Sequence, residues 1–128
     1  MNVKDQVALT KVNMAVVPPS SIIYEALALQ YGAFLAPKAD GTFGYGPFNW
    51  RGSPIKASVY HGAILRHELD WWDGENTAPD SLVHHLGHLK ATAGILIDAI
   101  ETGNLIDDRP PKGTAAALFE VFRLKAKT

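Results

Sequence analysis

Cysteine is absent from this chain of 128 residues. Disulfide frameworks and zinc sites with thiolate ligands are therefore excluded. No apolar run approaches the roughly 20 residues that a helix needs to cross a bilayer. Residues 1–6 also lack the charged-then-apolar order of a signal peptide. We therefore expect a cytoplasmic protein with no membrane partner.

A surplus of positive charge is also missing, since 12 lysines and arginines stand against 13 aspartates and glutamates. Proteins that bind duplex nucleic acid present a clustered basic face, so we expect no nucleic-acid partner. The chain contains no GxxxxGK[ST] phosphate loop, no GxSxG motif and no His-Asp doublet. The familiar signatures of P-loop proteins, serine hydrolases and HD phosphohydrolases are therefore absent.

Apolar residues recur at helical spacing in four parts of the chain. The predicted helices are residues 20–36, 54–73 and about 80–102, and a last helix capped by Thr114. Hydroxyl and carboxylate caps begin them, and glycine or proline ends them. The sequence therefore predicts an all-α fold, a small bundle of about four helices. We expect one domain over residues 1–128, with residues 1–19 as an arm that is extended or contains a short strand at 12–17.

Residues 37–54 form a long loop rich in glycine, proline and aromatic side chains. Loops of this length are uncommon in a compact domain and are often functional or disordered. The aromatic side chains favour order. Within the loop, residues 49–52 are candidates for lining a pocket.

The densest chemistry lies in residues 66–88, which contain five acids, four histidines and one arginine. The two central helices form an antiparallel hairpin. Counting outward from its middle places His67 level with His88, and Asp70 level with His85. Members of each i, i+3 pair share a helical face, so the two pairs can converge on one divalent cation. Carboxylate and imidazole donors suit Mn, Zn, Fe or Co, whereas Mg prefers oxygen ligands.

Other acids adjoin this face and complete the predicted site. The metal candidates are Glu68, Asp70, Glu75, His85 and His88. The catalytic candidates are Glu68, which would orient or deprotonate a water, and His67. The alternative is that the histidines are structural and that acids near helix ends, such as Asp80, are capping or solvated groups.

Candidates for holding a substrate flank the hairpin. Arg51 and Arg66 can bind phosphate in a bidentate way, and Lys38 is a weaker candidate. Asn49 and Trp50 can contact a nucleobase or sugar. The alternatives are a surface ion pair for the arginines and a loop anchored to the core by Trp50.

Short motifs occur in this order along the chain: Tyr31-Gly32-Ala33, Asn49-Trp50-Arg51-Gly52, Arg66-His67 with Trp71 and Gly74-Glu75, Pro79-Asp80-Ser81, and His85-Leu86-Gly87-His88. Taken together, they resemble a phage-encoded family, the dATP/dGTP diphosphohydrolases of the MazZ type. They are also similar to the MazG-like all-α nucleoside triphosphate pyrophosphohydrolases. The resemblance covers about residues 15–110.

The resemblance implies hydrolysis of dATP or dGTP to the monophosphate and pyrophosphate, with Mg or Mn. In phages that carry 2-aminoadenine, it implies a supply of dGMP to the modified-base pathway in the host cytoplasm. It also implies a homodimer or homotetramer that completes the helical core. The superfamily's acidic ExxE and ExxD motifs are replaced here by His67-x-x-Asp70 and His85-x-x-His88. We therefore expect Mn to be favoured over Mg, with Glu25 as a further candidate acid.

Two other functions compete with this hypothesis. One is a metal phosphohydrolase that releases triphosphate or phosphate. The other is a non-enzymatic helical phage protein that binds a nucleotide or a partner and keeps its histidines for structure. Identification of the products distinguishes the phosphohydrolase from the pyrophosphohydrolase. A His85→Ala variant that loses stability without losing activity would support the non-enzymatic protein.

Overall fold

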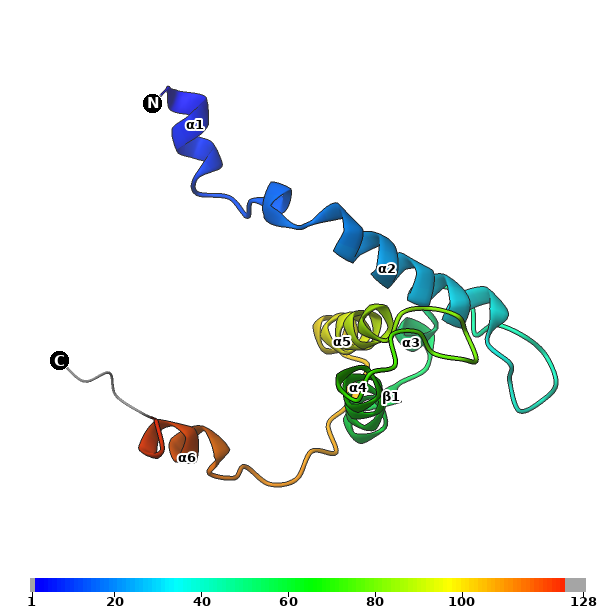
Figure 1. The fold of residues 1–128 in the computed structure, drawn as a ribbon. Coiled ribbons are helices and arrows are strands. Elements are labelled where there is room, and N and C mark those ends of the chain that lie inside the picture. The colour runs from blue at the N-terminus through cyan, green and yellow to red at the C-terminus, as the bar shows by residue number, and fades with distance from the viewer. Residues whose placement is uncertain (1, 124–128) are drawn as a thin grey trace.

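The computed structural model describes residues 2–123, and its main body is built from helices (Figure 1). This confirms the predicted all-α class. The α-helices are α1 (Val3–Ala8), α2 (Pro19–Gln30), α3 (Asn49–Gly52), α4 (Ala57–Trp72), α5 (His85–Glu101) and α6 (Ala115–Val121). A 3-10 helix, η1 (Met14–Val16), and a π-helix, η2 (Tyr31–Leu35), complete the helical elements, and β1 (Ile55–Lys56) pairs with β2 (Leu105–Ile106).

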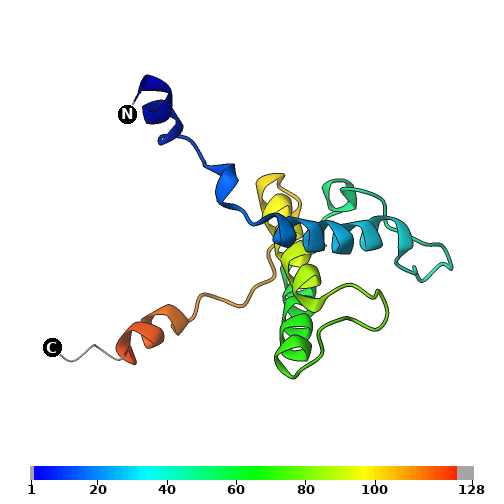
Figure 2. The same ribbon diagram turned by 45° about the horizontal axis from the view of Figure 1, so that its top comes forward.

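Helices α4 and α5 form the predicted antiparallel hairpin, and α2 lies across α5 (Figures 1 and 2). In both views α1 and α6 lie away from this three-helix body, toward the two ends of the chain. Residues 12–17 contain η1, so the short strand considered for this arm is wrong. None of the described helices is long and apolar enough to cross a membrane.

Helix α4 begins at Ala57, three residues later than the predicted start at Pro54. Ile55 is extended because it pairs with Leu105 in a parallel ladder, so Ser53 is not the cap. The Asp108 carboxylate instead accepts hydrogen bonds from the Ser58 backbone N–H, at 2.8 Å, and from the Ser58 hydroxyl. These bonds lower the pKa of Asp108. A residue 50 positions away thus caps this helix.

Helix α5 begins at His85, and the predicted start at Asp80 or Ser81 is wrong. Residues 73–84 form a loop closed by a bridge between Thr77 and His84. The Nδ1 atom of His84 accepts a hydrogen bond from the Leu86 N–H at 3.0 Å and caps the helix. Asp80 and Ser81 are therefore free to turn toward the hairpin. The predicted end is confirmed, since Gly103 adopts a φ of 73° just beyond the helix.

The predicted first helix is interrupted, because after Gln30 it continues as the π-helix η2 as far as Leu35. The carbonyls of Gly32 and Ala33 accept hydrogen bonds from Tyr45 and Gly46 at 3.0 and 2.9 Å. A Cβ on Gly44 would lie 2.4 Å from the Ala33 oxygen. The long loop is therefore ordered, as predicted, and it packs backbone to backbone against η2.

The core of the described chain is small. Ala28, Val83 and Ala91 form its buried cluster, with Leu29 and Tyr31 packed against them. Large apolar side chains on α2, α4 and α5 remain exposed, among them Ile23 (59%), Leu69 (60%), Trp72 (76%) and Ile97 (62%). Contiguous exposed apolar surface commonly marks an interaction face. One copy of the chain therefore buries few of its large apolar side chains.

Candidate functional site

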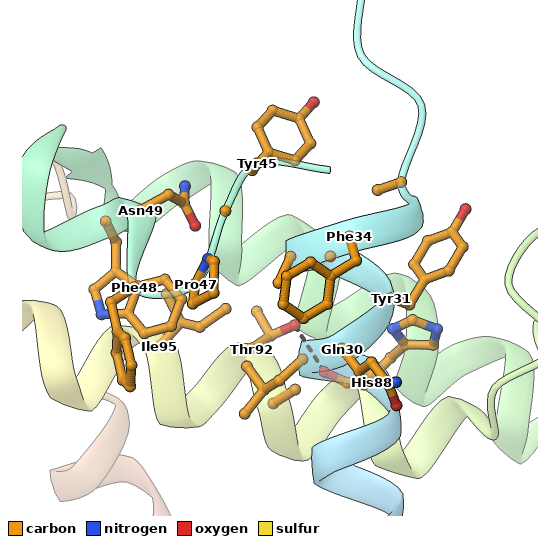
Figure 3. Close-up of a pocket in the computed structure, with 18 of the residues that line it drawn as sticks. Gln30, Tyr31, Phe34, Tyr45, Pro47, Phe48, Asn49, His88, Thr92 and Ile95 are labelled. Carbon is orange, nitrogen blue, oxygen red and sulfur yellow. Dashed lines mark hydrogen bonds between the residues drawn. The ribbon is translucent and has the colours of Figure 1, made fainter. Parts of the chain in front are cut away.

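Two adjoining cavities lie in the three-helix body, the first between α2, α4, α5 and the loop that carries α3, and the second between α4, α5 and the loop of residues 73–84. The first has a volume of about 660 Å³ and aromatic walls, and part of its lining is drawn in Figure 3. The second, of about 340 Å³, is polar and is lined by Arg66, His67, Asp70, Ala78, Pro79, Asp80 and His85. His67 and Asp80 line both cavities, so they stand at the junction of an aromatic and a polar chamber.

Three of the predicted histidines meet at this junction. The Nδ1 atoms of His67 and His85 lie 2.8 Å apart, and His67 stacks on His88 at 4.6 Å between ring centroids. Each ring is fixed further: Nε2 of buried His85 lies 2.7 Å from Glu75 Oε1, and Nε2 of His88 lies 2.6 Å from Ser81 Oγ. The level match counted from the sequence is therefore confirmed.

The environment of His67 and His88 favours their neutral forms. Burial, followed by the nearby His88, His85 and Arg66, lowers the pKa of His67 to about 4, against the attraction of Asp80. Burial also lowers the pKa of His88, against the attraction of Asp80. A neutral imidazole has a free ring nitrogen. At neutral pH His67 and His88 can therefore accept a hydrogen bond or bind a metal at that nitrogen.

Asp70, Glu75 and His85 form a group that fits a divalent cation, since one ligand atom from each lies within 4.8 Å of the others. The chain turns back after α4, where Glu75 N–H donates to the Asp70 carbonyl at 3.0 Å, and this turn places the two carboxylates together. His85 can offer Nε2 while its Nδ1 contacts His67. A metal-bound histidine usually has such a partner on its other nitrogen.

The other two metal candidates lie outside this group. Within residues 2–123, Glu68 is half-buried on α4 and lines neither cavity. His88 lines the aromatic cavity and is bonded to Ser81. The structure thus brings together three of the five metal candidates, with His67 beside them.

Of the five candidates for substrate binding, three line a cavity and two do not. Asn49 and Trp50 line the aromatic cavity, and Arg66 lines the polar one. Arg51 instead binds Asp98 in a bidentate way, with Nε and Nη2 at 2.8 and 2.9 Å. Lys38 lies over the ring of Tyr45 at 5.5 Å and lines neither cavity.

Asp98 is the most informative residue that sequence reasoning missed. It accepts hydrogen bonds from Trp50 Nε1 at 2.6 Å and from Arg51. These bonds, those from Arg51 first, lower its pKa to about 2. The sequence could have indicated Asp98, because it is the only charged residue between positions 91 and 100, in an otherwise apolar part of the helix. The sequence predicts only a capping or solvated role for Asp80, although it lines both cavities.

Comparison with known proteins identifies the family. A family model described as dATP/dGTP diphosphohydrolase, N-terminal, matches residues 1–109. No curated protein and no solved structure matches the chain. The family match covers most of the chain and all of both cavities. The chain therefore belongs to the dATP/dGTP diphosphohydrolase family, whose name describes a hydrolase acting on purine deoxynucleotides.

Proposed function

From its membership of this family, we propose that the chain hydrolyses dATP or dGTP to the nucleoside monophosphate and pyrophosphate. The observation that carries the proposal is the pair of cavities joined at His67 and Asp80. An aromatic chamber suits a nucleobase, and a polar chamber with an arginine and acids suits a phosphate chain with a cation. Ligand sites commonly combine apolar walls with a few placed polar groups in this way.

In the proposed reaction, the oxygen of water bonds to the α-phosphorus. The bond from that phosphorus to the bridging oxygen breaks, and pyrophosphate leaves with this oxygen. Arg66, which lines the polar chamber, would hold the phosphate chain through a guanidinium fork. Asp70, Glu75 and His85 would hold a divalent cation, Mg or Mn. Such a cation neutralises phosphate charge and activates water when bound.

His67 is the better placed of the two catalytic candidates. Its ring lines both chambers, and its lowered pKa keeps it neutral. When His85 Nε2 holds the cation, His85 Nδ1–H donates to His67 Nδ1, so the neutral His67 ring carries its proton on Nε2. This N–H would donate a hydrogen bond that orients the attacking water, and a carboxylate of the polar chamber would accept the water's proton. Glu68 remains a candidate from the sequence alone, because it lines neither cavity. The mixed carboxylate and imidazole group supports a preference for Mn over Mg.

We also propose that the working protein is a homodimer or homotetramer. Large apolar side chains are exposed on three helices of the body, and the cluster of buried residues is small. Pairing of copies through α2, α4 or α5 would remove these side chains from water at about 25 cal/mol for each Å².

The experiment is a panel of the four deoxynucleoside triphosphates, each with Mn, Mg or EDTA, with products separated by anion-exchange chromatography. The proposal expects monophosphate and pyrophosphate from dGTP or dATP, with turnover abolished by EDTA. Release of triphosphate or phosphate would indicate the other phosphohydrolase reaction. Intact nucleotides under all conditions would leave a nucleotide-binding or partner-binding protein.

A further inference from the structure

The turn that carries α3 is fixed at the end of the aromatic cavity. Phe48 adopts a φ of 56°, a left-handed conformation that is uncommon outside glycine. Trp50 and Arg51 both donate hydrogen bonds to Asp98 on α5. Asn104 Nδ2 donates to the Arg51 carbonyl at 2.8 Å. The backbone on both sides of position 49 is therefore held in place.

Asn49 differs from Trp50 and Arg51, because its side chain makes no hydrogen bond to another described residue. It is half-buried and lines the cavity, yet none of the side-chain hydrogen bonds among the described residues involves its carboxamide. No buried side-chain polar atom among the described residues lacks a partner, so this carboxamide is in reach of water and its donors and acceptor are open to a ligand. A rigid turn that presents such a group to an aromatic chamber is suited to recognising a ligand.

The position of Asn49 in the cavity determines which part of a bound nucleotide it would contact. Figure 3 shows Asn49 and His88 at opposite ends of the cavity, with Phe34 and Thr92 between them. His88 stacks on His67, which opens into the polar chamber. A nucleotide with its phosphates at the polar end would therefore place its base toward Asn49.

We propose that the Asn49 carboxamide recognises the N7 edge of the purine, the edge that adenine and guanine share. Adenine presents N7 as an acceptor beside an amino donor, and guanine presents N7 beside the O6 acceptor. The amide NH₂ of Asn49 can donate to N7 in either base, and its oxygen can accept from the amino group of adenine. Pyrimidines have no N7. This inference rests on the proposed function and deepens it, because it explains acceptance of both purines by one side chain.

Asp98 is a positioning residue in this proposal. Its carboxylate lies on the far side of Trp50 and Arg51 and does not line either cavity. By holding both neighbours, it holds the turn at position 49. Replacement of Asp98 would therefore act on base recognition through Asn49, without a contact of its own to the nucleotide.

The test uses 7-deaza-dGTP and 7-deaza-dATP, in which a carbon replaces N7. We expect the wild-type chain to lose about tenfold in kcat/KM on each analogue, chiefly in KM, because the amide donor is left unpaired. Asn49→Ala should lose about tenfold on the natural nucleotides and nothing further on the analogues. Asn49→Asp keeps the shape and removes the donor, so it should also abolish the difference between natural and 7-deaza nucleotides.

Gln30→Ala is the matched control, since Gln30 is the other carboxamide in the lining and lies nearer His88 in Figure 3. This variant should keep the tenfold difference. Asp98→Asn should reduce the difference and raise KM more than it changes kcat. A wild-type chain that treats both nucleotide forms alike, or Asn49 variants that keep the full difference, would overturn the proposal.

Failure of the proposed function can be told apart from failure of this inference. Calorimetric titration of dGTP and 7-deaza-dGTP into the wild-type and Asn49→Asp chains measures the same ratio without turnover. If no nucleotide is hydrolysed but binding shows the N7-dependent difference in the wild-type chain alone, the reaction is wrong and the base contact holds. If hydrolysis yields pyrophosphate with no N7-dependent difference, the reaction holds and the base contact is wrong.

Discussion

His67 and His85 meet through their Nδ1 atoms at 2.8 Å, across the two antiparallel helices of the hairpin. Because one of the two nitrogens must donate and the other accept, the protonation of one ring sets that of the other. On its other nitrogen His85 reaches Glu75. The contact thus joins the proposed cation group to the ring that opens into both chambers.

The first prediction concerns metal affinity. His85→Ala removes one ligand and should raise the apparent dissociation constant for Mn by at least about tenfold, as measured by titration calorimetry. His88→Ala is the matched control, because His88 lies outside the three-residue group and should retain the affinity of the wild-type chain. Equal losses in both variants would favour the four-residue site that the sequence spacing predicted.

The second prediction concerns the loop that closes the aromatic chamber. Gly44→Ala should destabilise the chain by more than about 1 kcal/mol, because the new Cβ would lie 2.4 Å from the Ala33 oxygen at a φ of +80°. Gly41→Ala has a similar φ of +85° but nothing within 4 Å, so it reports the backbone strain alone. Urea unfolding of both variants measures the difference. A Gly44 variant no less stable than the Gly41 variant would show that the close approach to η2 is not needed.

The third prediction concerns the stability of the chain at low pH. The pKa of Asp98 is lowered to about 2 from its usual value of 3.8, chiefly by hydrogen bonds from Arg51 and then Trp50. The unfolded chain therefore binds the proton more readily, and the contribution of Asp98 to stability is present above about pH 4 and is lost as the pH falls toward 2. We expect the free energy of unfolding of the wild-type chain to exceed that of Asp98→Asn at pH 6, with the gap narrowing below pH 4. A gap that stays constant down to pH 2 would argue against the ion pair.

The fourth prediction concerns association. Leu69 and Trp72 are 60% and 76% exposed at the end of α4, so charged replacements there should weaken a dimer. Size-exclusion chromatography with light scattering should give a dimer or tetramer for the wild-type chain and smaller species for Leu69→Glu and Trp72→Glu. Val12→Glu, at an 87% exposed position in the N-terminal arm, serves as the control. A wild-type chain that is monomeric at high concentration would refute the oligomer.

The hairpin histidines were predictable from the sequence because helical spacing is a local property. The i, i+3 pairs and the antiparallel hairpin determine which side chains stand level, and the structure places His67 against His85 and His88. Glu75 was also predictable, since it follows the helix end at once. These residues needed only a count along two helices.

Contacts across the chain were not predictable in the same way. The start of α4 was misplaced because Ser53 is a good local cap, whereas the pairing of Ile55 with Leu105 and the Asp108 cap are decided by residues about 50 positions away. The start of α5 was misplaced because Asp80 is also a good local cap, whereas the bridge between Thr77 and His84 keeps residues 73–84 in a loop. The pairing of Arg51 with Asp98 is equally distant. The sequence predicts either phosphate binding or a surface ion pair for Arg51, and no pattern near position 51 reveals Asp98 as its partner.

The most direct measurement is hydrolysis of dGTP in water labelled with oxygen-18, with Mn present and the products resolved by mass spectrometry. Attack at the α-phosphorus predicts dGMP that carries one labelled oxygen, and pyrophosphate that carries none. Label in pyrophosphate, or release of triphosphate or inorganic phosphate instead, would contradict the proposed reaction.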